Sequence, residues 1–95
     1  MSFWVYILAS RPGGTLYVGV TSHLIRRIFE HCEGLVRGFT KRYGVKMLAY
    51  YEQHDTAYAA IQREKNIKHW SSEWKIDLIV LMNPDWRDLY DEITK

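Results

Sequence analysis

The sequence is poor in the residues that build cross-linked, metal-clamped or membrane-spanning proteins. Its 95 residues include one cysteine, Cys32, and two prolines. A single cysteine excludes an internal disulfide framework, and no Cys-x-x-Cys or paired Cys/His spacing indicates structural zinc. No apolar run approaches the length of a membrane span, and the N-terminal residues lack the basic leader of a secretory signal. We therefore expect a cytoplasmic protein with no membrane association.

Bulky apolar residues, by contrast, are abundant. Hydrophobic residues make up 47% of the chain and aromatic residues 15%, including four Trp and seven Tyr. This composition is typical of a folded protein and excludes a disordered one. Ninety-five residues can build one modest core and are too few for two. We expect a single domain over residues 1–95, so that any active site is assembled within it.

Positive charge is concentrated in the first three quarters of the chain. Residues 1–75 contain eleven Lys and Arg against six Asp and Glu, a difference of +5, whereas residues 76–95 contain two against five, a difference of −3. Residues 23–46 alone hold six of the cations and only two acids. This density suits a phosphate backbone and indicates a nucleic acid partner. A solvated surface is the plainer explanation of the same charges.

Two apolar segments at the start of the chain predict a β-hairpin. An apolar and aromatic run at residues 3–9 and a second run at residues 15–20 are separated by an Arg-Pro-Gly-Gly turn. The turn predicts a register in which Tyr6 pairs with Gly19. Alternation along the strands then places Tyr6 and Tyr17 on the same face of the sheet. We expect the glycine opposite Tyr6 to leave room for a ligand.

The rest of the chain predicts helices and one more strand. The expected elements are a helix capped by Thr21 or Ser22 and ending near residue 33, a mobile basic loop at 35–44, a strand at 45–52, a helix capped by Asp55 and ending near residue 70, a helix at 73–81 and a helical turn at 86–90. This order, β-β-α-β-α-α, predicts an α+β fold in which a small three-stranded antiparallel sheet is flanked by helices.

Helical spacing also predicts which side chains face the core. The inward positions expected on the first helix are Leu24, Ile25, Ile28 and Cys32, and those on the helix at 73–81 are Trp74, Asp77 or Leu78, and Leu81. Arg27 and His31 flank the first of these stripes, whereas Arg26 points to solvent. Two adjacent arginines are thus expected to have different roles.

One carboxylate stands where the helical pattern calls for a core residue. The apolar positions between residues 55 and 70 are Ala57, Ala60, Ile61 and Ile67, and Glu64 lies three or four residues from three of them. An ionised carboxylate is costly to desolvate unless it is paired or binds a metal. An ion pair with Lys68, four residues on, and a functional role explain this position equally well.

These residues occur in an order that resembles a known family. Val5-Tyr6-Ile7-Leu8 and Leu16-Tyr17-Val18-Gly19 are similar to the paired signature of the GIY-YIG nuclease superfamily, with Val before Tyr-Ile in the first element and Val for Ile in the second. Residues 21–31 resemble its first-helix motif, and Arg63-Glu64-Lys65 with Lys68 resemble its metal-helix motif. The chain is identified as a member that is similar to the small standalone bacterial proteins of this superfamily.

The resemblance implies a metal-dependent endonuclease that hydrolyses DNA by single-step attack of water, with single-stranded or irregular DNA as a suitable substrate. The catalytic residues it implies are Tyr6, Tyr17, Arg27, His31 and Glu64, and the substrate-binding residues are Gly19, Lys41, Arg42, Tyr43 and Lys68. Glu64 would hold Mg²⁺ or Mn²⁺, with waters and the substrate phosphate completing its shell. We favour Tyr6 over Tyr17 as the base, provided that cations depress its pKa, and the reverse assignment stays open.

Two other functions are compatible with the same residues. One is a nucleic-acid-binding module that kept the scaffold and lost the chemistry, although the presence of all five catalytic positions argues against such decay. The other is a structural or partner-binding domain in which Glu64 merely pairs with Lys68.

Overall fold

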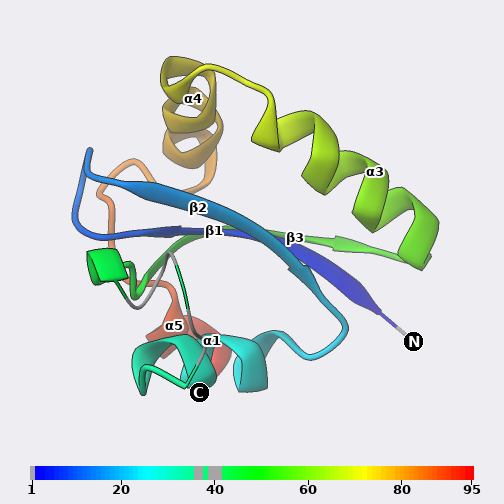
Figure 1. The fold of residues 1–95 in the computed structure, drawn as a ribbon, viewed down its shortest axis with the longest axis horizontal. Helices are drawn as coiled ribbons and strands as arrows, with labels where there is room; N and C mark the ends of the chain where they lie inside the picture. Colours follow the sequence, from blue (N-terminus) through cyan, green and yellow to red (C-terminus); the bar gives the residue numbers. More distant parts are fainter. Residues whose placement is uncertain (1, 36–37, 39–41) are drawn as a thin grey trace.

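A three-stranded antiparallel sheet lies between two layers of helices in the computed structural model, which describes residues 2–35, 38 and 42–95. Its strands are β1 (Phe3–Ala9), β2 (Leu16–Thr21) and β3 (Met47–His54), in the spatial order β2-β1-β3. One face is covered by α3 (Ala57–Lys68) and α4 (Ser72–Met82), and the other by α1 (Leu24–Cys32) and α5 (Tyr90–Ile93) (Figure 1). The α+β class and the helix-flanked antiparallel sheet expected from the sequence are confirmed.

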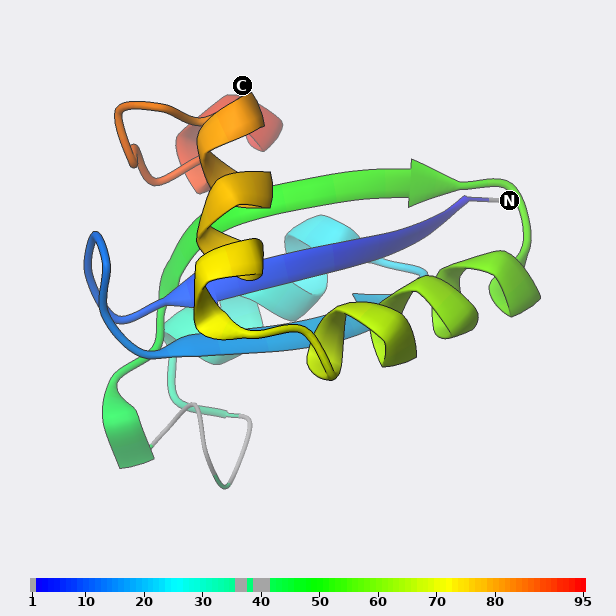
Figure 2. The same ribbon diagram turned by 90° about the horizontal axis from the view of Figure 1, so that it is seen from above.

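The two faces of the sheet are named here after the helices that cover them, the α3 face and the α1 face. Seen from above, α4 crosses the strands, whereas α3 runs beside β2, the edge strand (Figure 2). Side chains of α3 can therefore approach residues of the α1 face around this edge. In the described part of the chain no helix is both long and apolar enough to cross a membrane.

Both faces of the sheet are packed, which explains the continuous apolar run in β1. Val5 through Ala9 are all buried, because the central strand has a helix layer on each side. The buried residues of the α3 face are Val5, Ile7, Ala9, Val18, Ala49, Tyr50, Ala60, Ile67 and Ile79. Those of the α1 face are Tyr6, Leu8, Leu24, Ile28, Val45, Leu48 and Leu89.

The hairpin has the register that the sequence predicts. Tyr6 is opposite Gly19 and Leu8 is opposite Tyr17, and the Ser10 amide donates to the Thr15 carbonyl at 3.0 Å across the turn. The room expected above Gly19 is absent, however. A Cβ built on Gly19 would collide with the Cζ and hydroxyl of Tyr6, so the Tyr6 ring itself occupies that space. The glycine is needed for the close approach of a phenol rather than of a ligand.

Several helix ends differ from those predicted. The N-cap of α3 is Thr56 rather than Asp55, since its hydroxyl accepts from the Ala59 amide at 3.1 Å. The N-cap position of α1 is His23, and Thr21 instead accepts from the His23 amide. β3 lies two residues later than expected. The predicted turn at 86–90 is wrong, because Trp86 has a φ of 53°, which ends any helix there, and α5 begins at Tyr90.

The predicted inward stripes are correct only in part. The apolar residues predicted to face inward that are exposed instead are Ala57, Ile25, Ile61, Trp74 and Leu81. On α4 the buried residue is Ile79, which the predicted stripe did not include. A helix with apolar residues on all sides gives no clear stripe, so the face that packs is decided by the sheet. Half of the basic loop predicted at 35–44 lies outside the described residues, and Lys41 is among those not described.

The packing of Tyr6 on Gly19 gives a direct stability prediction. Gly19→Ala should lower the free energy of unfolding by about 1–3 kcal/mol, because the added methyl overpacks the contact. Urea unfolding would measure this in the wild-type and in a Tyr6→Leu background. The loss should be much smaller without the Tyr6 ring. An equal loss in both backgrounds would mean that another neighbour makes the glycine necessary.

Candidate active site

Three rings from three elements form the centre of the site. Tyr6 on β1, Tyr17 on β2 and His31 on α1 have centroid separations of 6.4 Å for the two tyrosines, 5.9 Å for Tyr6 and His31, and 5.5 Å for Tyr17 and His31. The Tyr6 hydroxyl and His31 Nε2 are 3.1 Å apart in a buried hydrogen bond. The phenol donates this bond when Nδ1 carries the ring proton of a neutral imidazole.

The polar edge of α1 supplies the cationic side of the site. Arg27 is paired with Glu30 one turn later, Nε to Oε1 at 3.7 Å, and its side chain is 44% exposed. Helical spacing placed Arg27 at the margin of the core, whereas the structure leaves it exposed. A polar cavity of about 330 Å³ adjoins it, lined by Thr21, Ser22, His23, Arg26, Arg27 and Glu30. Guanidinium and hydroxyl donors around such a cavity are suited to phosphate oxygens.

Glu64 is the acidic member of the site. Its side chain is 13% exposed, and its Oε2 is 3.2 Å from Nζ of Lys68 on the next turn of α3. The ion pair considered from the sequence is therefore present. Glu64 nevertheless lies close enough to Tyr6 for its charge to raise the pKa of that phenol. The same carboxylate is thus both part of a helix-surface ion pair and a neighbour of the buried rings.

Burial governs the acidity of Tyr6. Loss of solvent raises the pKa of Tyr6 far above its usual range, and the neighbouring Tyr17 phenol raises it further. Arg27 opposes these effects, whereas Glu64 and Glu30 add to them. The requirement that cations depress the pKa of Tyr6 is not met by the protein alone. Tyr6 is therefore a neutral phenol at physiological pH, and any proton it accepts must be matched by one that it gives up.

His31 is the group placed to take that proton. Burial lowers its pKa from the ordinary value of 6.5, Arg27 lowers it further and Glu30 acts in the opposite direction. A neutral imidazole is favoured, with Nε2 able to accept from Tyr6. Sequence spacing placed His31 at the margin of the core, whereas only 2% of the residue is exposed.

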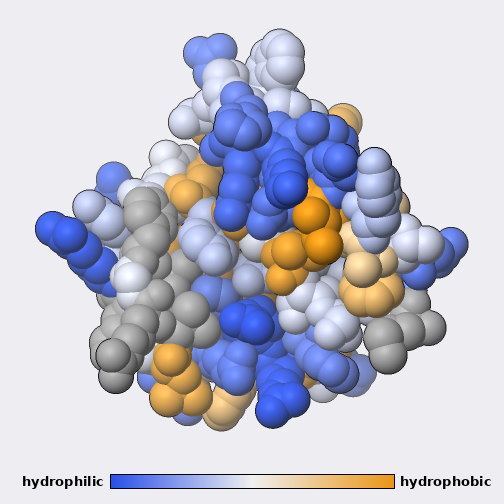
Figure 3. Space-filling view, turned by 45° about the vertical axis from the view of Figure 1, so that its right-hand side comes forward, coloured by the Kyte–Doolittle hydropathy of each residue, from blue (hydrophilic) through white to orange (hydrophobic). Residues whose placement is uncertain are grey.

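On the face of the molecule seen in Figure 3, hydrophilic and apolar side chains lie at different heights. Hydrophilic side chains gather in two groups, one at the level of α3 and one at the level of α1, with apolar side chains between them. The view is turned about the vertical axis of Figure 1, so these levels correspond to the two helix layers. A ligand spanning both groups would cross the β2 edge of the sheet.

The other predicted site residues are distributed as follows. Gly19 is buried beneath Tyr6, so it acts through that ring. Arg42 and Tyr43 are exposed, and the Arg42 guanidinium lies 5.6 Å from the centroid of the Tyr43 ring. Lys68 is paired with Glu64, and 49% of its side chain is exposed. Their roles in substrate binding stay predictions.

Sequence reasoning missed two acidic residues that bear on the site. Glu30 is paired with Arg27, and its charge raises the pKa of both Tyr6 and His31. Glu52, on β3, binds Arg63, the residue before Glu64. The sequence could have indicated this cluster, because Tyr50, Glu52 and His54 alternate along a strand and so share one face of the sheet.

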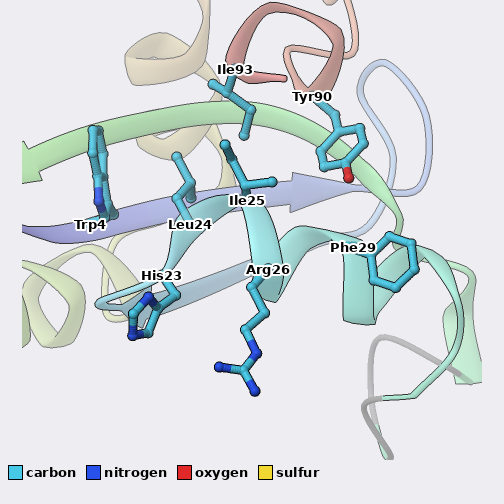
Figure 4. A pocket seen from close by; sticks show the side chains of 8 residues that line it. All are labelled: Trp4, His23, Leu24, Ile25, Arg26, Phe29, Tyr90 and Ile93. Atoms are coloured by element: carbon cyan, nitrogen blue, oxygen red, sulfur yellow. The ribbon is translucent and has the colours of Figure 1, made fainter. Parts of the chain in front are cut away.

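A larger groove lies along the opposite edge of α1 (Figure 4). Its volume is about 620 Å³, and its lining is Trp4, His23, Leu24, Ile25, Arg26, Phe29, Tyr90 and Ile93. Ile25 and Phe29 are each about half exposed, at 49% and 48%. The lining contains no carboxylate, so the groove itself is not equipped to bind a metal or activate water. Its aromatic walls are suited to flat apolar rings.

The lowered pKa of His31 predicts an acid-sensitive contribution to stability. The unfolded chain binds a proton near pH 6.5 and the folded chain only at lower pH, so this contribution is present above pH 6.5 and is lost as the pH falls through the folded-state pKa. His31→Gln should flatten the dependence of unfolding free energy on pH below about pH 6.5. The exposed His69→Gln is the matched control and should retain the wild-type slope.

Comparison with known proteins places the chain in a family. The model of the GIY-YIG catalytic domain matches residues 2–77. A UPF0213 protein of Staphylococcus saprophyticus is 34% identical over 76 residues, covering 80% of this chain and 92% of the relative. A UPF0213 protein of Natronomonas pharaonis is 37% identical over 76 residues, covering 80% and 88%.

A solved structure has a similar fold. The solution NMR structure of a UPF0213 protein from Bacillus halodurans is 28% identical, has a TM-score of 0.58 and covers 93% of each chain. The matched region contains both tyrosines, the α1 cation and histidine, and Glu64. The family predicted from the sequence is thereby confirmed: the chain belongs to the GIY-YIG nuclease superfamily.

Proposed function

We propose that this protein is an endonuclease that hydrolyses DNA phosphodiester bonds by direct attack of water, using Mg²⁺ or Mn²⁺ held at Glu64. The observation that carries the proposal is the convergence of Tyr6, Tyr17, His31, Arg27 and Glu64 from four separate elements. Membership of the nuclease superfamily implies a nucleic acid substrate. Metal dependence, the choice of DNA and the residue roles are parts of the proposal, and the cytoplasmic location stays a prediction.

The donor set of Glu64 fits a hard divalent cation. In the described part of the chain no group of three or more His, Cys, Asp or Glu side chains could hold a metal ion. Glu64 would thus be the protein ligand, and waters with a phosphate oxygen would complete the shell, as Mg²⁺ tolerates. When bound, the ion would neutralise charge that develops on the phosphate. Lys68, now on the carboxylate, would turn toward solvent or substrate.

The proton of the attacking water is assigned to the Tyr6–His31 pair. Tyr6 is too weak an acid to be a phenolate, so its oxygen would accept the water proton as its own proton passes to His31 Nε2, 3.1 Å away. The neutral state of His31 makes this transfer available. Tyr17, packed against both rings, would orient the phosphate or the water.

Arg27 is assigned to the phosphate itself. Its side chain is exposed enough to reach a ligand, and its guanidinium is paired with Glu30 on the same helix. Two parallel N–H donors can bind two phosphate oxygens at once, which a lysine ammonium cannot reproduce. The adjoining polar cavity has the size and donors to hold the rest of that phosphate group.

Unpaired DNA is the substrate form that the surface favours. The aromatic groove beside α1 shares Arg26 and His23 with the polar cavity, so the backbone of a strand at Arg27 has the Arg26 cation on its path toward Trp4 and Phe29. Base–aromatic stacking requires bases that are not already stacked in a duplex. A domain of this size has few side chains left to read base edges, so strong sequence specificity is not expected.

Glu64→Gln tests the metal site. The variant should lose cleavage by at least about a hundredfold, because a neutral amide replaces the anionic ligand, while its affinity for DNA in EDTA stays within about twofold of wild type. Matched single-stranded, duplex and branched DNA with Mg²⁺, Mn²⁺ or EDTA would be compared. The control, Glu73→Gln, removes an exposed carboxylate from α4 and should cut normally. If Glu64→Gln cuts DNA at the wild-type rate, Glu64 is not a metal ligand needed for cleavage.

Tyr6→Phe tests the proton path. Removing the hydroxyl should lower kcat by about 10²–10⁴-fold and leave DNA affinity nearly unchanged, since general base catalysis contributes gains of this order. The ring is kept, so its packing on Gly19 persists. Tyr58→Phe, at an exposed position of α3, is the matched control. If Tyr6→Phe cleaves at the wild-type rate, Tyr6 is not the base, and Tyr17 or solvent accepts the proton.

An inactive binding module is the second candidate, and two observations favour it. Glu64 is already paired with Lys68, and burial raises the pKa of Tyr6. A module of this kind would bind DNA with an affinity that falls steeply with salt and would cut no substrate form. The cleavage series above separates the two functions, provided that the wild-type protein is folded.

A further inference from the structure

A polar network on the α3 face joins β3 to the helix that carries Glu64. Tyr50 donates to Glu52 Oε1 at 2.6 Å, and His54 Nε2 contacts Oε2 of the same carboxylate. Arg63 Nε donates to both Glu52 oxygens, at 3.2 and 3.1 Å. Glu52 therefore has three side-chain partners, and one of them is the residue immediately before Glu64.

The Glu52–Arg63 pair is partly buried, and its neighbours limit its movement. The side chains of Glu52 and Arg63 are 17% and 33% exposed, so the pair is shielded from much of the solvent. The Arg63 guanidinium also lies 5.2 Å from the Trp70 ring centroid, and Trp70 packs against the core of the α3 face. A guanidinium fixed between a carboxylate and an aromatic face has little freedom to turn.

Helix geometry connects this pair to the site. Successive residues of a helix are about 100° apart, so Arg63 and Glu64 flank the line of Ala60 and Ile67 on opposite sides. Ala60 and Ile67 are the buried residues of α3, and Arg63 reaches from this line toward β3. Glu64 then faces the β2 side of the helix. Because α3 packs against both β2 and β1, the charge of Glu64 reaches Tyr6 on β1. Rotation of α3 about its axis would move both side chains together.

The apolar contacts of α3 do not by themselves fix that rotation. One of its two buried residues is an alanine, whose small side chain can be accommodated at several helix orientations. A hydrogen bond from a guanidinium to a carboxylate has a preferred distance and direction. The charged pair therefore supplies the directional constraint that the apolar contact lacks.

We propose that Glu52 and Arg63 are positioning residues that fix the rotation of α3 and so direct the Glu64 carboxylate toward the Tyr6–Tyr17 centre. The inference rests on the proposed function, since it assigns the network to metal binding at Glu64. Tyr50 and His54 hold the Glu52 carboxylate in the orientation that Arg63 requires. None of these four side chains touches the substrate in this assignment.

The test is an Mn²⁺ titration of the folded protein followed by NMR. Paramagnetic broadening of the Tyr6, Tyr17 and Gly19 amide signals reports binding at Glu64 without any need for cleavage. Arg63→Gln and Glu52→Gln should each raise the Mn²⁺ concentration for half-broadening by about tenfold, as loss of residues that orient a metal ligand does. The double variant should shift no further than either single one, because the two residues act as a unit. The half-saturating Mn²⁺ concentration for cleavage should shift in parallel.

Lys75→Gln is the matched control, because it removes a cation from the neighbouring helix α4, outside the metal-helix motif. It should leave the Mn²⁺ midpoint unchanged. Arg63→Lys, which keeps the charge, is used if Arg63→Gln does not fold, and its expected shift is about threefold in the same direction. Melting temperatures of all variants are measured alongside.

The outcomes separate this inference from the proposed function. Variants that melt at a lower temperature but keep the wild-type Mn²⁺ midpoint would show that the network only stabilises the fold, and the inference would be wrong. A wild-type protein whose signals show no Mn²⁺ effect would refute the metal site at Glu64, and the positioning role with it. The first failure appears only in the variants, whereas the second appears in the wild type.

Discussion

The packing of the Tyr6 ring on Gly19 is the contact on which the geometry of the site depends. It requires the antiparallel register of β1 and β2, because a slip of one residue would place Tyr6 and Tyr17 on opposite faces of the sheet. With the ring seated on the glycine, its hydroxyl reaches His31 on α1. The hairpin, the first helix and the site are thereby linked through one side chain.

Burial on this face determines the chemistry that the site can perform. It keeps Tyr6 protonated and His31 neutral, and these two states together form a donor and an acceptor. Neither residue alone is a good base for water in these surroundings. The exposed members, Arg27 and Lys68, are the ones able to meet a large anionic substrate. The site thus separates a buried proton path from an open phosphate-binding edge.

Much of this was available from the sequence. The turn residues and the spacing of the strands were enough for the register, since a hairpin with a short turn leaves few alternatives. Helical spacing placed Glu64 on the inward side of α3 and Arg27 at the margin of α1. The same spacing wrongly predicted that Ile25, Ile61, Trp74 and Leu81 are buried. Periodicity identifies the apolar face of a helix but not how much of that face a neighbouring element covers.

The fold class and the pairing of Tyr6 with Gly19 follow from local spacing and residue type, and the set of converging residues follows from the resemblance of the sequence motifs to the GIY-YIG superfamily. Only the tertiary structure decided that Tyr6 fills the space over Gly19, that His31 is its partner, and that Glu52 holds Arg63. Tyr6 and His31 are 25 positions apart in the chain, and Glu52 and Arg63 are 11 positions apart. Tyr6 and Gly19 face each other across two strands. The distances in these contacts depend on how helices settle on the sheet, and no local pattern encodes that packing.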